Sequence, residues 1–206
     1  MLNKRKNLVV ILILVVIIVT AIIFNQPKNQ RQEIHFEEIE EVISLIQDGD
    51  IIFRMGDRIW SQFFRDLSPT ERRFSHLGIV RKRDDVITVI NSEAMQEYDD
   101  VVTEVTLERF LQPALCVGLF RMHDLDGELI SDTAMEFIGI PFDWKFDMED
   151  SSKLYCTELL YVVLKKIYPS IKLNTTYIKE LGKNIILLDI CLQTEYFTEI
   201  GYWITR

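Results

Sequence analysis

The feature that most constrains this chain is an amphipathic helix that begins at a cysteine. After Asp150, Ser151 and Ser152, apolar side chains recur at helical spacing. They are Cys156, Leu159, Leu160, Val163, Leu164 and Ile167. Aspartate and serine cap helix starts, and the exposed N–H groups of a first turn favour a thiolate. Cys156 therefore stands where a nucleophile would be placed, although a cysteine there also serves as a small apolar packing residue.

A second apolar segment lies near the start of the chain. The 17 residues from Leu8 to Phe24 are almost entirely apolar and follow Lys4, Arg5 and Lys6. This is the short end of a membrane span, and no small-x-small cleavage site follows it. We expect a membrane anchor and tether over residues 1–32 and one domain over 33–206, outside the cytoplasm of a single-pass protein. A cleaved signal peptide and secretion remain the alternative.

The charge of the predicted domain limits its partners. Five of the 23 basic residues lie in residues 1–32, so the rest of the chain carries 18 basic against 32 acidic residues. This balance argues against nucleic acid and against electrostatic binding to anionic lipid. Three widely spaced cysteines and no glycine-rich phosphate loop give no motif for a metal or another cofactor. The pairing of Cys116 with Cys191 stays open.

Alternation and turn residues predict a mixed α and β domain. We expect helices over residues 35–47, 57–67 and 128–138, and strands over 51–54, 75–80, 86–93 and 115–122. The charged residues 81–85 are expected to form the turn of an antiparallel hairpin between two of these strands. The end of the chain, 184–206, mixes strand and loop character.

A cysteine hydrolase needs a histidine as base and a polar group that orients it. Of the three histidines, His35 lies near the tether and His123 in a polar turn, which leaves His76 at the start of a strand. Glu93 ends the neighbouring strand, from which a carboxylate can reach the imidazole. Individually, a core histidine and a surface carboxylate explain these residues as well.

Four short motifs occur in a distinctive order. Gly49–Phe53, Ser75–Val80, Asn91–Ala94 and Tyr155–Leu159 together resemble the YiiX/YebB-like permuted papain-like amidases, relatives of the NlpC-type peptidases. The resemblance covers roughly Asp48 to Pro169 and implies a circularly permuted papain-like α+β fold. In that fold an antiparallel sheet packs against the cysteine-bearing helix.

The resemblance also implies roles for particular residues. Cys156 would be the nucleophile, His76 the general base and then acid, and Glu93 the group that orients His76. The backbone N–H of Cys156 would donate to the oxyanion. Tyr155 and Trp144 are candidates for contact with the substrate, although an aromatic cluster in the core is an equal alternative for Trp144. Glu158 is expected to point away from the site, because two residues along a helix turn a side chain by about 200°.

The expected activity is cleavage of an amide bond in a cell-wall peptide or an N-acyl amino acid, through an acyl-enzyme. The substrate would be a small-molecule, peptide or lipid-like amide. Two alternatives remain: a lipid thioesterase or acyltransferase on a similar permuted fold, and an inactive relative that binds a ligand.

Overall fold

The structure, a computed structural model, describes residues 36–94 and 100–204. The chain divides into two compact units, Met1–Gln32 and Glu33–Arg206, and the fold below is that of the second unit. Within the described residues, no helix is long and apolar enough to cross a membrane. The anchor predicted over residues 1–32 lies outside them.

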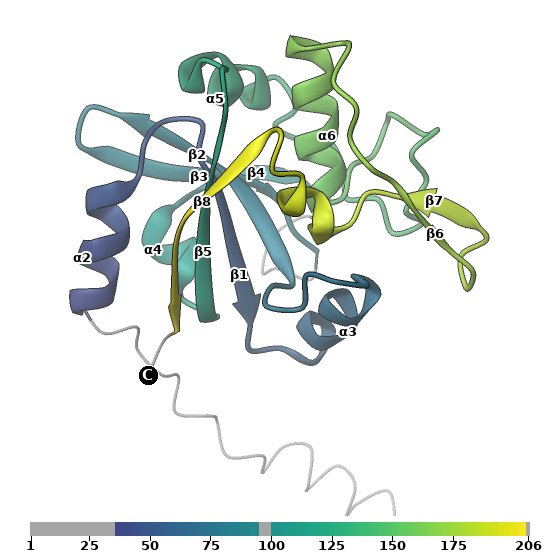
Figure 1. Cartoon of the computed structure of the whole chain (residues 1–206), viewed down its shortest axis with the longest axis horizontal. Coiled ribbons are helices and arrows are strands. Elements are labelled where there is room, and N and C mark those ends of the chain that lie inside the picture. The colour runs from purple at the N-terminus through teal and green to yellow at the C-terminus, as the bar shows by residue number, and fades with distance from the viewer. Residues whose placement is uncertain (1–35, 95–99, 205–206) are drawn as a thin grey trace, which may run out of the picture. The chain divides into compact units, whose positions relative to one another are not determined.

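The core is a six-stranded antiparallel sheet in the order β4-β3-β2-β1-β5-β8 (Figure 1). Its strands are β1 (Ile51–Gly56), β2 (His76–Arg83), β3 (Val86–Ser92), β4 (Val102–Thr106), β5 (Ala114–Met122) and β8 (Phe197–Ile204). A separate two-stranded ribbon consists of β6 (Thr176–Ile178) and β7 (Lys183–Ile185). The hairpin predicted after residue 75 is confirmed as β2 and β3.

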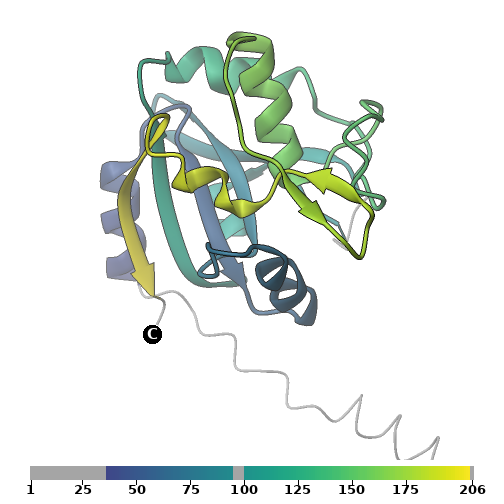
Figure 2. The same ribbon diagram turned by 45° about the vertical axis from the view of Figure 1, so that its right-hand side comes forward.

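Helices cover both faces of this sheet (Figure 2). One face packs against α5 (Gly127–Met135) and α6 (Cys156–Ile167), and the other against α2 (Phe36–Leu45) and α4 (Leu107–Leu111). Two further helices are α3 (Ile59–Leu67) and the 3₁₀ helix η1 (Leu188–Leu192). Because both faces are covered, every residue of β1 is buried, which explains the unbroken apolar run at its start.

The predicted cysteine helix is confirmed as α6. Leu159, Leu160, Val163 and Leu164 on its inner face are at most 1% exposed. Each such side chain contributes roughly 1.5–3 kcal/mol of hydrophobic free energy on burial. This packing fixes the helix, and with it Cys156, against the sheet.

Gly49 and Asp50 shape the entry to β1. Gly49 has a φ of +75°, and a Cβ built on it would lie 2.4 Å from the Cα of Gly127. Asp50 is buried, accepts a hydrogen bond from the N–H of Gln47 at 2.8 Å and pairs with Arg121 at 2.7 Å. A side chain at position 49 would therefore separate α5 from the sheet.

The prediction was wrong for the charged residues 81–83. They continue β2 and pair with β3, and the turn is confined to Asp84 and Asp85. Arg83 has acidic partners, Asp48 and Asp132, that stabilise its charge at the end of a strand. The strand β4, the helix α4 and the ribbon were not predicted, because they are short and lack a clear apolar period.

Candidate active site

Cys156 is the first residue of α6, and its neighbourhood is built by the strand that carries His76. The backbone N–H groups of Leu77 and Thr157 both hydrogen-bond to the Cys156 sulfur. Leu77 follows His76 at the start of β2, so this contact holds the helix start against the histidine strand. Beside it, a Cβ built on Gly78 would lie 2.3 Å from a methyl carbon of Val89, so only glycine fits between β2 and β3 there.

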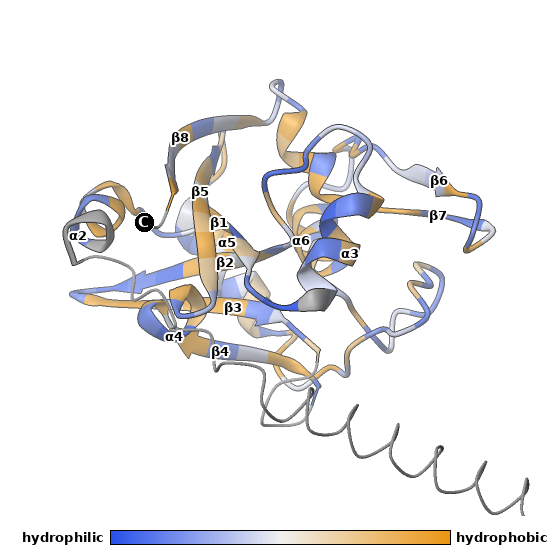
Figure 3. Cartoon of the chain, turned by 90° about the horizontal axis from the view of Figure 1, so that it is seen from below, coloured by the Kyte–Doolittle hydropathy of each residue, from blue (hydrophilic) through white to orange (hydrophobic). Residues whose placement is uncertain are grey.

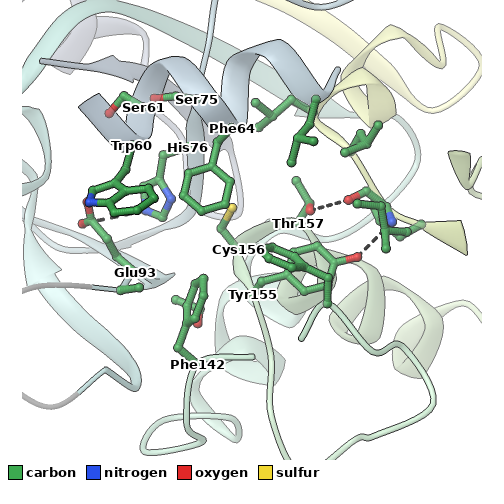
Figure 4. Close-up of a pocket in the computed structure, with 18 of the residues that line it drawn as sticks. Trp60, Ser61, Phe64, Ser75, His76, Glu93, Phe142, Tyr155, Cys156 and Thr157 are labelled. Carbon is green, nitrogen blue, oxygen red and sulfur yellow. Dashed lines mark hydrogen bonds and ion pairs between the residues drawn. The ribbon is translucent and has the colours of Figure 1, made fainter. Parts of the chain in front are cut away.

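The side chains of Cys156 and His76 face one cleft (Figure 4), whose empty volume is about 900 Å³ with open solvent included. All five residues predicted for the site line this cleft: Cys156, His76, Glu93, Tyr155 and Trp144. Apolar side chains of α3, the loop before α6 and the stretch after β7 form most of the remaining wall. A largely apolar lining with a few polar groups is typical of pockets that bind small molecules.

Asn91, which the sequence analysis did not single out as a site residue, is the hydrogen-bond partner of His76. The imidazole Nε2 lies 3.1 Å from the Asn91 side-chain oxygen and 3.9 Å from the nearer Glu93 oxygen. Asn91 is fully buried, and its own side-chain nitrogen has no hydrogen-bond partner within the described structure. In the tautomer in which Nε2–H donates a hydrogen bond to the Asn91 oxygen, Nδ1 is the basic nitrogen of the ring. Asn91 could have been predicted from the alternation of side chains along β3, because Asn91 and Glu93 lie two residues apart and share a face.

Arg54 on β1 is a second residue that the sequence analysis missed. It pairs with His76 in the strand register, forms an ion pair with Glu93 and hydrogen-bonds to the carbonyl oxygen of Phe110. Its guanidinium also lies over the Phe110 ring, 4.6 Å from the centroid. Arg54 is 3% exposed, so a permanent positive charge is buried beside the imidazole.

Burial sets the protonation states of the central pair. It lowers the pKa of His76 to about 4, with the charge of Arg54 acting in the same direction and Glu93 against it. Burial also raises the pKa of Cys156 to about 11, against the effect of the Leu77 and Thr157 N–H groups. The lowered thiol pKa expected from the helix start is therefore wrong for the resting cleft, because desolvation of the thiolate outweighs the hydrogen bonds that favour it.

Glu158 was expected to point away from the site. Its side chain does not line the cleft and is instead buried in the interior of the domain. It is 2% exposed, and its carboxyl accepts a hydrogen bond from the Tyr155 N–H at 3.4 Å, which caps α6. Burial raises the Glu158 pKa to about 8, with Asp143 adding to the effect. At neutral pH this side chain is mostly protonated, so it adds little negative charge near the cysteine.

Tyr155 and Trp144 occupy different positions on the cleft wall. Tyr155 is buried, its ring centroid lies 5.1 Å from that of Phe146, and its hydroxyl oxygen accepts a hydrogen bond from the Ile186 N–H at 2.9 Å. Trp144 is 50% exposed and packs edge-on against Phe142 at a centroid distance of 5.1 Å. Tyr155 thus ties the helix start to the opposite wall, whereas Trp144 lies at the mouth.

The other two cysteines lie apart from the cleft. All three are free thiols, so Cys116 and Cys191 do not pair. Cys116 donates a hydrogen bond to the carbonyl oxygen of Arg73 at 3.1 Å, and Cys191 lies 4.0 Å from a Glu71 oxygen. Burial raises the pKa of both thiols, and neither lines the cleft that Cys156 and His76 share, which indicates structural side chains.

A cysteine at a helix start and a histidine on the adjacent strand, facing one cleft, are the arrangement of the papain-like class of cysteine hydrolases. The model of the permuted papain-like amidase family, YaeF/YiiX or C92, matches residues 45–189, and the chain belongs to this family.

The fold is shared with a solved structure. The crystal structure of the metalloprotein yiiX from Escherichia coli O157:H7 superposes with a TM-score of 0.63 at 17% sequence identity. The match covers 75% of this chain and 96% of that one. At this identity the similarity shows the fold alone. No curated protein matches the chain.

Proposed function

We propose that this protein is a membrane-tethered cysteine hydrolase that cleaves the amide bond of an N-acyl compound through an acyl-enzyme. The observation that carries the proposal is the shared cleft of Cys156 and His76, whose walls are largely apolar. Membership of the amidase family supports an amide as the scissile bond. The apolar walls favour an acyl chain over a polar cell-wall peptide on the carbonyl side of that bond.

The proposed reaction begins from the neutral pair. As the Cys156 sulfur bonds to the substrate carbonyl carbon, the thiol proton passes to Nδ1 of His76. The backbone N–H of Cys156 donates to the oxyanion. The C–N bond then breaks, the amine leaves with the proton from His76, and a thioester remains. Water attacks the thioester, gives its proton to His76, and the acid and the thiol are released.

Asn91 and Glu93 have separate roles in this proposal. Asn91 orients the imidazole through the contact to Nε2 and stabilises the imidazolium as it forms. Glu93 lies 3.9 Å from the same nitrogen and is held by Arg54, so its carboxylate acts on His76 through charge. Tyr155 and Trp144 are proposed to contact the acyl group from the wall and the mouth.

The similar yiiX protein is described as a metalloprotein, which raises the question of a metal in this cleft. Within residues 36–94 and 100–204 of this chain, no three His, Cys, Asp or Glu side chains converge as metal ligands. The donor set at the cleft also includes a carboxylate already paired with Arg54. The described residues therefore do not fit a metal, and no step of the proposed reaction uses one.

The test is turnover of fatty-acyl amides by the full chain, with release of the amine and of the fatty acid measured separately. Equal release of both products supports the hydrolase. If the amine is released while the acyl group appears on an added alcohol or amine, the protein is an acyltransferase, a reaction that the same apolar cleft would serve. Absence of both products with every acyl amide would favour an inactive, ligand-binding relative.

A further inference from the structure

The helix α3 is amphipathic, yet its aromatic side chains are not part of a core, and Leu67 packs against the edge of one. Trp60, Phe63, Phe64 and Leu67 follow the spacing i, i+3, i+4, i+7 that places them on one side of the helix. Among the side chains of α3 that the structure describes, residues 60–67, none is buried. Trp60 is 51% and Phe63 52% exposed. Exposed aromatic side chains gathered on one short helix are typical of a surface that binds a partner.

A second segment adds aromatic side chains at the same place. Phe146, from the loop before α6, lies with its ring centroid 5.9 Å from that of Phe64. Trp144 in the same loop is 50% exposed and lines the cleft, as do Trp60 and Phe64. We call the set Trp60, Phe63, Phe64, Trp144 and Phe146 the aromatic rim. It borders the mouth of the cleft from two segments about 80 residues apart in sequence.

The chain that precedes α2 indicates what covers this rim. It holds the apolar run Leu8–Phe24 and then 11 residues, 25–35, before α2 begins. Eleven residues span at most about 40 Å, so an anchored chain would keep the domain close to the bilayer. The start of α2 and the helix α3 both lie toward the lower side of the domain in Figure 1, and α3 faces the viewer in Figure 3.

The side chains of the rim suit a lipid interface. Tryptophan combines an apolar ring with an N–H group and gathers at the level of lipid headgroups. The side of α3 that carries Ser61, Gln62 and Arg65 is polar, as in helices that lie in the plane of a membrane. Because the predicted domain carries a large net negative charge, the attraction must come from the apolar side chains and not from anionic lipid.

We propose that the aromatic rim docks into the interfacial layer of a lipid bilayer, with the mouth of the cleft facing the lipid. An acyl chain would then pass from the bilayer into the cleft without crossing water. The docking itself rests on the exposed rim and the preceding apolar run. The passage of an acyl chain rests on the proposed function.

The three tryptophans of the chain allow a direct test, because residues 1–32 contain none. Full-length single-tryptophan variants would keep Trp60, Trp144 or Trp203, with phenylalanine at the other two positions. Each is reconstituted into phosphatidylcholine vesicles, with or without bromine on the acyl chains, and its fluorescence is measured. Trp203 on β8 packs against the core on the α2 side of the sheet and is the control.

The expected result is quenching of Trp60 and Trp144 by brominated lipid of roughly two-fold, because an interfacial helix buries its apolar side about 5–10 Å into the layer. Trp203, which is partly buried and lies outside the rim, should be quenched less than either of them. In the Trp60 variant, Phe63→Ser should reduce the quenching if the rim docks as a unit.

Equal emission with and without bromine at Trp60 and Trp144 overturns the proposal. Cross-linking between two copies through the rim, without quenching, would assign the rim to a second copy and overturns it as well. The measurement needs no turnover, so it separates docking from catalysis. If Trp60 and Trp144 are quenched in a protein that shows no turnover, the proposed hydrolase activity is refuted and the proposed docking of the rim is retained.

Discussion

The Nε2 atom of His76 lies closer to the side-chain oxygen of Asn91 than to the nearer carboxylate oxygen of Glu93, at 3.1 Å against 3.9 Å. The glutamate is instead engaged by the buried guanidinium of Arg54. The polar groups beside the candidate base are therefore divided between one that orients the ring and an ion pair that sets its electrostatic environment. This division, together with the burial of the thiol, leads to five predictions.

The first prediction concerns the reacting pair. Cys156→Ser and His76→Ala should each lower kcat/KM by at least about 1,000-fold, because each removes a group that bonds to substrate or carries the proton. Cys156→Ser should change thermal unfolding little, because it exchanges one atom, whereas His76→Ala leaves a buried position unfilled and Asn91 without this partner and should lower the melting temperature without preventing folding. Cys116→Ala is the matched control, and it should keep the activity while lowering stability. Retained turnover in Cys156→Ser would exclude a thioester.

The second prediction separates Asn91 from Glu93. Asn91→Ala should reduce kcat by about 10- to 100-fold through loss of ring orientation, less than the roughly 100- to 10,000-fold that the acid–base group itself contributes. Glu93→Gln preserves the shape and should cost less. Rates are compared at the pH optimum of each variant, after circular dichroism has established that both are folded. If Glu93→Gln lowers kcat more than Asn91→Ala does, the glutamate and not the asparagine is the group that orients His76.

The third prediction concerns Arg54. Arg54→Met removes a positive charge that opposes the imidazolium and leaves Glu93 without its partner, so the pKa of His76 should rise from its value of about 4. Glu93→Gln should move the pKa of His76 in the opposite direction. Histidine NMR titration of the full chain measures both. Arg54→Met should also destabilise the fold, by less than the roughly 3–5 kcal/mol of a fully buried pair, because the Glu93 carboxylate that loses its partner is 23% exposed.

Arg121→Met is the control for Arg54→Met. It likewise removes the arginine partner of a carboxylate, in this case that of the buried Asp50, away from the cleft. It should destabilise the fold without moving the pKa of His76. If Arg54→Met fails to fold, Glu93→Gln alone tests the direction of the shift. An unchanged or higher His76 pKa in that variant would refute the assigned role of the ion pair.

The fourth prediction is a pH dependence of stability that originates at Glu158. Its pKa is about 8 in the folded protein and 4.5 in an unconstrained chain. The folded state thus holds the proton between these values while the unfolded state releases it, so stability falls as the pH rises from 4.5 to 8. Glu158→Gln should match the wild type near pH 4.5 and exceed it at pH 8 in chemical denaturation.

The difference between Glu158→Gln and wild type cancels the contribution of His76, whose lowered pKa acts with the opposite sign. As the pH falls from 6.5 to 4, the unfolded chain takes up a proton on this histidine before the folded protein does. The folded state therefore loses up to about 3 kcal/mol of stability over this range. A constant difference between the two proteins across the pH range would contradict the assignment to Glu158.

The fifth prediction concerns thiol reactivity. Since the pKa of Cys156 is raised to about 11, alkylation by iodoacetamide at pH 7 should be no faster than that of a free thiol. The rate should climb with pH above 8, and His76→Ala should leave it unchanged. Fast alkylation well below the usual thiol pKa, abolished in His76→Ala, would show instead a preformed thiolate–imidazolium pair.

The family and much of the fold could be predicted because they rest on local patterns. The period of α6, the alternation in β2 and β3, and the turn at Gly49–Asp50 each follow from neighbouring residues. Elements such as β4 and β8 could not be placed from the sequence, because a sheet edge lacks a strong apolar pattern and forms only when its neighbour is present.

The sequence by itself determined the residue types of the site and their order along the chain. Only the tertiary structure decided how they act. Asn91 and Arg54 come to His76 from two neighbouring strands, and which of them touches the ring depends on register and distance. The pKa values of Cys156 and His76 depend on the water that folding removes around them, and a linear pattern of residues contains no measure of that loss.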